Sequence, residues 1–91
     1  MAEARRWRVV VGRRAKRVMA RLPADVNERI DRAIMALPDE PRPAGCVKLK
    51  GHDILWRIRV GDWRVTYAIR QEQLVILVVE VSPRGGAYRN L

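Results

Sequence analysis

Three arginines near the middle of the chain, Arg57, Arg59 and Arg64, are the residues whose type and spacing point most directly to chemistry. They fall within residues 54–69, where apolar and polar residues alternate on both sides of a Gly-Asp pair, a pattern that predicts a β-hairpin. A guanidinium group is planar and presents a fork of N–H donors that matches the oxygens of a phosphate. The sequence therefore predicts a site for a phosphate-rich partner, first of all RNA.

The register of this hairpin follows from its turn. Gly61 and Asp62 form a two-residue connection with glycine first, as tight primed turns favour. The predicted pairs are Val60 with Trp63, Arg59 with Arg64, Ile58 with Val65, Arg57 with Thr66, and Trp56 with Tyr67. Because side chains alternate across a sheet, the arginines and the threonine share one face, and the aromatic and aliphatic residues share the other.

The basic face of the hairpin has two interpretations. It can be a solvated surface that is basic by chance, or it can be a binding site for an anion. Arg59 directly opposite Arg64 is an unfavourable pair in a sheet, and no acidic residue accompanies the arginines on this face of the hairpin. We therefore favour an anion-binding site over a merely solvated face.

Composition supports a nucleic acid as partner or substrate. The chain has 91 residues, 48% of them hydrophobic, which suits one globular domain with a modest core. Lys and Arg number 19 against 10 acidic residues, a formal net charge of +9 that attracts polyanions. Solubility is the alternative reason for such a charge. A membrane surface is less well supported, because no predicted helix combines a broad apolar face with a basic one.

Hydrophobic periodicity divides the chain into short elements. Alternation predicts a strand at residues 7–11, and 3.6-residue spacing predicts two amphipathic helices at 13–22 and 26–37, followed by a Pro-rich loop at 38–45. Further strands are predicted at 46–50, 54–60, 63–70 and 74–82. The order indicates one α+β domain over residues 1–91. It has an N-terminal strand, a helical hairpin, and a three- to four-stranded antiparallel sheet with the helices on one face.

The C-terminal segment adds two residues to the predicted site. Residues 74–79 are apolar at every position, which predicts a buried central strand. Pro83 and a pair of glycines then end the strand and let the chain turn beside the hairpin. Arg84 and Tyr88 are therefore expected at the open end of the sheet, near the arginines.

Cys46 is the one cysteine and His52 the one histidine, so neither an internal disulfide nor a metal-ligand cluster is expected. The N-terminal residues have no apolar core after their charges, and the longest apolar run is far too short to span a bilayer. We expect a cytoplasmic protein that needs no metal or other cofactor.

Several blocks of the sequence resemble the RelE/ParE superfamily of bacterial and archaeal toxins, and within it the RelE-type messenger-RNA endonucleases, or mRNA interferases. The resemblance covers nearly the whole chain. It includes the early strand, the helical hairpin with Leu22-Pro23 at its turn, and the loop at 41–45. Its most specific block is residues 56–67, Trp-Arg-Ile-Arg-Val-Gly-Asp-Trp-Arg-Val-Thr-Tyr, which follows Lys48-Leu49-Lys50-Gly51 and precedes the ending Arg84 to Tyr88.

The resemblance implies a RelE-like fold and cleavage of mRNA, commonly on the ribosome, without a metal. A ribose 2′-oxygen attacks its neighbouring phosphate and leaves a 2′,3′-cyclic phosphate and a 5′-hydroxyl end. The implied catalytic residues are Arg57, Arg59, Arg64, Arg84 and Tyr88. By analogy Arg57 and Arg64 stabilise the charged transition state, Arg84 protonates the leaving oxygen, and Arg59 with Tyr88 handles the 2′-hydroxyl. Lys48, Lys50 and His52 are expected to bind RNA.

The resemblance also implies a protein partner, and it leaves functions other than RNA cleavage open. A small cognate antitoxin would neutralise such a toxin, and the exposed side of the helical hairpin is one candidate contact surface. ParE-like members share the fold but inhibit DNA gyrase, and an inactive relative would only bind nucleic acid. Some relatives have lysine at the positions of Arg57 and Arg59, or a histidine near Ser82-Pro83. Since arginine does not give up its proton, the identity of the general base is open.

Overall fold

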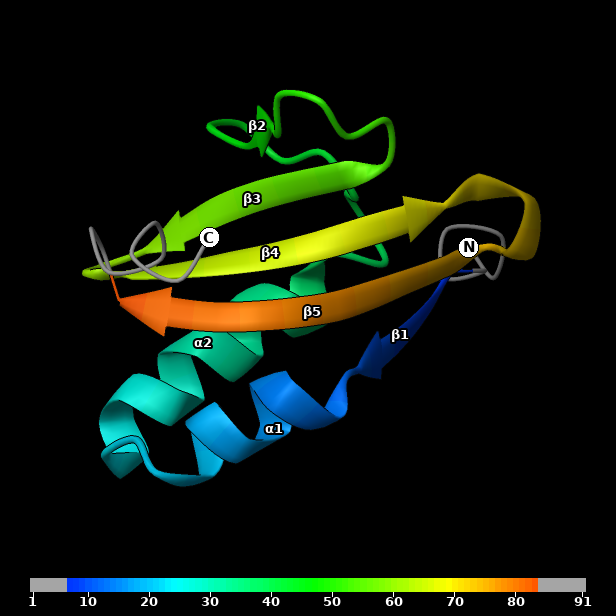
Figure 1. Ribbon diagram of the computed structural model, residues 1–91. Coiled ribbons are helices and arrows are strands. Elements are labelled where there is room, and N and C mark those ends of the chain that lie inside the picture. Colours follow the sequence, from blue (N-terminus) through cyan, green and yellow to red (C-terminus); the bar gives the residue numbers. More distant parts are fainter. Residues whose placement is uncertain (1–6, 84–91) are drawn as a thin grey trace.

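A five-stranded sheet with two helices on one of its faces forms the described part of the protein (Figure 1). This computed structural model describes residues 7–83. In chain order the elements are β1 (Arg8–Val11), α1 (Arg13–Ala20), α2 (Ala24–Ala36), β2 (Val47–Lys48), β3 (Leu55–Val60), β4 (Trp63–Arg70), a 3₁₀ turn (Gln71–Gln73) and β5 (Val75–Pro83). The strands lie in the order β1-β5-β4-β3-β2. Neither of the described helices is long and apolar enough to cross a membrane.

The predicted α+β architecture is confirmed, and its sheet is larger than the sequence indicated. β1 pairs in parallel with β5, with Arg8 opposite Val75, so the N-terminal strand becomes one edge of a mixed five-stranded sheet. Parallel neighbours need a long crossover connection, and here most of the chain serves as that connection. β5 therefore has a neighbour on each side, as expected for the strand predicted to be central.

The strand predicted at residues 46–50 is much shorter than expected. Only Val47–Lys48 pairs with β3. On either side Gly45 and Gly51 have φ angles of +89° and +83°, left-handed conformations that interrupt an extended strand. The backbone N–H of His52 donates to the carbonyl of Leu49 at 3.3 Å and closes a turn. Most of this segment therefore forms turns beside the edge of the sheet.

The predicted register of the β3–β4 hairpin is confirmed, from Trp56 opposite Tyr67 to Val60 opposite Trp63. Gly61, the first central residue of the turn, has φ +61°, whereas the second central residue has a negative φ. This is the φ pattern of a type II′ turn, whose twist matches that of the flanking strands. Each strand of the hairpin has an apolar face and a basic face. In this register the two basic faces lie on the same side of the sheet.

The apolar stripes of both helices pack against the inner face of the sheet, as predicted. α1 contributes Ala15 and Met19, and α2 with its C-cap contributes Ile30, Ile34 and Leu37. The buried sheet residues of this core are Ile58, Val65, Tyr67, Ile69, Ile76, Val78 and Val81. The opposite side of the sheet, here called the open face, carries the side chains that alternate with these. Burial on one side thus determines what the other side presents.

One extra residue in β5 changes which of its side chains reach the open face. Thr66 pairs with Glu80, but the next residue of β4 pairs with Val78, which leaves Val79 without a partner on β4. In such a β-bulge two residues of one strand oppose one residue of the other. Strict alternation would put Glu80 on the core side together with Val78. The bulge instead turns Glu80 to the open face and Val81 to the core, where Val81 is 2% exposed.

Tyr67 ties the loop at residues 38–45 to the sheet. Its hydroxyl donates a hydrogen bond to the carbonyl oxygen of Pro41 at 2.7 Å. Burial raises the pKa of this hydroxyl and the neighbouring Cys46 raises it further, so the group stays protonated and remains a donor. In the same loop the Arg42 guanidinium lies 5.1 Å from the centroid of the Trp56 ring, within cation–π range.

Replacing Tyr67 by phenylalanine removes this hydrogen bond while keeping the buried ring. We expect Tyr67→Phe to lower the free energy of unfolding by about 1 kcal/mol, the usual net contribution of one such bond. Urea denaturation with an unchanged m-value measures the loss. Ser82→Ala is the matched control, because its buried hydroxyl has no hydrogen-bond partner among residues 7–83 and its removal should cost nothing. Equal stabilities of Tyr67→Phe and the unsubstituted protein would contradict the anchoring role.

Candidate functional site

Two rows of polar side chains cross the open face of β3, β4 and β5. The first row consists of Arg59, Arg64 and Ser82, and the second of Arg57, Thr66 and Glu80. Neighbouring strands lie about 4.8 Å apart, and successive rows on one face are about 7 Å apart along the strands. The structure thus brings the three predicted arginines of the hairpin into one patch, here called the arginine patch.

The members of the arginine patch differ in exposure. Arg57 and Arg64 are half-buried, whereas Arg59 is exposed. Arg64 stands on β4, which has a neighbouring strand on each side, and its Nη1 atom is shielded from solvent. Arg59 donates from Nε to the carbonyl of Gly61 at 3.3 Å, which keeps it beside the turn. Because partly buried charges are less screened by water, Arg57 and Arg64 are better placed to act strongly on a bound anion.

Ser82, opposite Arg64 on β5, adds a hydrogen-bonding group to the first row. The residue is 8% exposed, and its hydroxyl oxygen is buried without a hydrogen-bond partner among residues 7–83. Leaving a buried polar group without a partner costs roughly 1–3 kcal/mol. Ser82 thus lies next to Arg64 in the row, but its hydroxyl oxygen does not reach the solvent-exposed surface.

A cleft of about 570 Å³ opens next to the second row. Its floor includes Arg57 and Glu80, and its wall is the turn-rich segment that follows β2. The full lining is Val47, Lys48, Leu49, Lys50, His52, Leu55, Arg57, Thr66, Val79 and Glu80. All three predicted RNA-binding residues therefore meet one member of the arginine patch in a single basic cleft. Cations around an apolar lining can hold both the phosphates and the bases of a single strand.

Glu80 also lines the basic cleft, although the sequence did not single it out. It follows an apolar run and looks like the polar end of a buried strand. The one available signal was a break in alternation, because Glu80 would share the core face with Ile76 and Val78 if β5 were regular. A carboxylate does not fit among buried aliphatic residues, so this break predicts a bulge that turns it outward.

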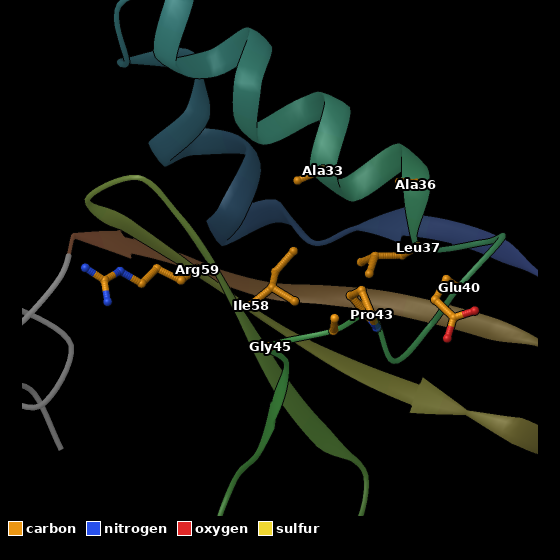
Figure 2. A pocket seen from close by; sticks show the side chains of 9 residues that line it. Ala33, Ala36, Leu37, Glu40, Pro43, Gly45, Ile58 and Arg59 are labelled. Atoms are coloured by element: carbon orange, nitrogen blue, oxygen red, sulfur yellow. The ribbon is translucent and has the colours of Figure 1, made fainter.

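A second, more apolar cleft of about 510 Å³ lies between the end of α2, the loop at 38–45 and β3 (Figure 2). Leu37 and Ile58 line its middle, and Figure 2 shows Glu40 and Arg59 at opposite ends. The Arg59 side chain points away from the other lining residues in this view. The cleft therefore borders the arginine patch without containing its guanidinium groups.

The last two predicted catalytic residues, Arg84 and Tyr88, lie outside the described residues. The described part of β5 ends at Pro83, which pairs with Trp63 at the turn end of the hairpin. The chain therefore leaves the described region beside the first row of the site, one position before Arg84.

The family described as ParE toxin of type II toxin–antitoxin system, parDE, matches residues 9–88. That range includes both helices, the arginine patch and the basic cleft. The chain belongs to this toxin family. The RelE/ParE resemblance inferred from the sequence is confirmed.

Individual relatives agree with this assignment. RelE1 of Methanocaldococcus jannaschii is 28% identical to the toxin over 88 residues, which are 93% of this chain and 98% of that protein. The archaeal RelE-RelB complex from Pyrococcus horikoshii matches with a TM-score of 0.78 and 29% identity, over 88% of this chain and 97% of the other. The isolated E. coli RelE toxin, at 22% identity and a TM-score of 0.75 over 92% and 93% of the two chains, shows the shared fold alone.

The arginine patch makes a prediction about anion binding. Removing one phosphate contact to a single strand lowers the slope of log Kobs against log salt by about 0.7. We expect Arg64→Ala to show this decrease with a fluorescently labelled single-stranded RNA, and to weaken binding at every salt concentration. Arg70→Ala is the control, because Arg70 lies on the same face but about 20 Å along the strand. Equal slopes for both variants would mean that the patch does not contact phosphates.

Proposed function

We propose that the toxin is a metal-free endoribonuclease that cleaves mRNA on the ribosome in the cytoplasm. The observation that carries this proposal is the half-buried Arg64 on an interior strand, next to Arg57 and Arg59 on a face that neither helix covers. A patch that only attracted polyanions would not need a partly buried guanidinium. Preorganised cations in a partly dry position are what the stabilisation of developing negative charge requires.

The proposed reaction begins with attack of a ribose 2′-oxygen on its own 3′-phosphate. The P–O5′ bond breaks, and the products are a 2′,3′-cyclic phosphate and a 5′-hydroxyl end. The phosphorane-like transition state carries more negative charge than the substrate, so Arg57 and Arg64 bind it more tightly than the ground state.

The remaining roles are carried over from the RelE-type endonucleases. Arg84 would deliver a proton to the departing 5′-oxygen, and Arg59 with Tyr88 would orient the 2′-hydroxyl. Tyr88 could instead stack on a base, as aromatic side chains often do with splayed RNA. Lys48, Lys50 and His52 would hold the flanking nucleotides in the basic cleft, because they line it together with Arg57.

We also propose a cognate antitoxin as the neutralising partner. The similar structure from Pyrococcus horikoshii is a RelE-RelB complex, and the toxin family is defined by its place in toxin–antitoxin systems. The outer sides of α1 and α2 are exposed and remain our candidate contact surface.

Inhibition of DNA gyrase is the second candidate function, since the family that matches this chain is described as ParE toxin. The two functions make different demands on the arginine patch. RNA cleavage needs its cations at the reacting phosphate, whereas binding to a protein target does not. Linearised or broken plasmid DNA in expressing cells would indicate gyrase as the target.

Mapping RNA ends after brief induction tests the proposal directly. We expect the unsubstituted toxin to produce new 5′-hydroxyl ends and matching 2′,3′-cyclic phosphates within mRNA. Arg64→Ala should reduce this cleavage at least about 100-fold, the size typical of losing one preorganised charge-stabilising group. Arg70→Ala, which removes the same charge at the far end of β4, should keep it.

The experiment is run with and without purified ribosomes, because positioning of the substrate can supply much of the rate. Cleavage with ribosomes alone supports ribosome-dependent action. No cleavage by the unsubstituted toxin under either condition would overturn the endonuclease proposal. Equal activity of Arg64→Ala would instead remove Arg64 from the catalytic set.

A further inference from the structure

A negatively charged side chain lies in the basic cleft, where binding of RNA alone would not require one. Among the described residues that line this cleft, Glu80 is the acidic one, beside Lys48, Lys50 and Arg57. A carboxylate in this place repels phosphate, so it opposes simple binding of a polyanion.

The fold holds Glu80 at this place. β5 pairs with β1 up to Val78 and with β4 as far as Pro83, so Glu80 lies in a segment that is paired with β4 just beyond the end of the β1 pairing. The β-bulge at Val79 turns the carboxylate outward, and Val81 and Val78 on either side of the bulge are anchored in the core. A side chain on such a rigid element is positioned more precisely than one on a loop.

Glu80 is also close to the arginines that would hold the phosphate. It lies opposite Thr66 and diagonal to Arg64, a relation that corresponds to about 7–8 Å between the two residues of neighbouring strands. Arg57 completes the same row from the other side of Thr66. A phosphate bound by the two guanidinium groups therefore has its own ribose within reach of the carboxylate.

We propose that Glu80 is the general base that removes the proton from the attacking 2′-hydroxyl. This inference rests on the proposed endonuclease function and assigns the group that the arginines cannot supply, because a guanidinium keeps its proton. A carboxylate is acceptor-only when ionised and suits this step.

The Glu80 carboxylate takes the 2′-proton while the 2′-oxygen forms its bond to phosphorus. The P–O5′ bond breaks, and its electron pair leaves on the 5′-oxygen. That oxygen takes a proton that water supplies through Arg84, so the guanidinium stays charged throughout. The hydroxide that remains takes up the proton that Glu80 releases when the cyclic phosphate leaves.

His52 is the competing candidate for this role, since it lines the same cleft. Its side chain is exposed and stands on a turn at the edge of the sheet, where its own backbone N–H donates to Leu49. Glu80 is half-buried and is paired with Thr66 of β4. The more rigid position favours the carboxylate, and both residues enter the test.

Single-turnover cleavage of an RNA that the unsubstituted toxin cuts, with ribosomes if they are required, provides the test. Glu80→Gln keeps the shape and hydrogen-bonding capacity of the side chain but cannot accept the proton. We expect it to slow cleavage at least about 100-fold, the usual size of a general-base contribution. RNA affinity should stay equal or increase, because a repulsive charge is removed. Glu72→Gln, at the opposite end of β4 in the 3₁₀ turn, is the matched control and should leave both unchanged.

Chemical rescue separates a proton-transfer role from a structural one. Acetate or formate should restore part of the activity of Glu80→Ala, and chloride at the same ionic strength should not. Three results would overturn the assignment. Glu80→Gln could cleave at the full rate, or carboxylates could fail to restore activity to Glu80→Ala. Cleavage could also be lost in His52→Asn and kept in the Glu80 variants. If the unsubstituted toxin makes no cyclic phosphate, the proposed function itself fails. If the toxin cleaves RNA and the Glu80 variants cleave it equally fast, only the assignment of Glu80 fails.

Discussion

Both helices pack against the same face of the sheet, and the arrangement of its polar side chains depends on this one-sided cover. Once Ile58, Val65 and Tyr67 are buried under α1 and α2, the residues between them must lie on the open face. A slip of one residue in the hairpin would bury the guanidinium groups and expose the aromatic rings. The hydrophobic core therefore holds Arg59 opposite Arg64, although the two cations repel each other. The free energy gained by burying the core face therefore offsets the repulsion between the two arginines on the open face.

The bulge in β5 interrupts the alternation of side chains between the core face and the open face at one position. It shifts the alternation between Val78 and Glu80, so that the core keeps its aliphatic residues and the open face gains a carboxylate. β-Bulges often re-aim a side chain beside a functional site. In this toxin the bulge changes the character of the patch from a uniformly cationic surface to a cluster with an acceptor at one side. Binding and proton transfer can then be assigned to different groups.

Much of the fold and part of the site could be predicted from the sequence. The register of the hairpin was predictable because both strands alternate and Gly61 determines the turn. The helices followed from their apolar spacing. The parallel position of β1 was not predictable, because its partner is remote in the sequence and its four residues carry no pairing signal.

The site was predicted less completely for the same physical reason. Arg57, Arg59 and Arg64 lie on one hairpin, so local alternation was enough to bring them together. Glu80 joins them through a long-range pairing and a bulge, which local patterns do not encode. β2 is shorter than predicted because Gly45 and Gly51 adopt left-handed conformations. Glycine is compatible with both extended and left-handed backbone, so its presence in the sequence does not show which one it adopts.

The parallel pairing of β1 with β5 also affects how the protein is made. Arg8 pairs with Val75, so both of these distant segments must be available before this edge of the sheet can close. Contacts between such distant segments carry a loop-closure cost and slow folding. β4 likewise lacks one of its two neighbours until β5 has emerged from the ribosome. Ser82 and Glu80 therefore join the rows of the arginine patch only after β5 has been made and has paired with β4, later than the hairpin itself can form.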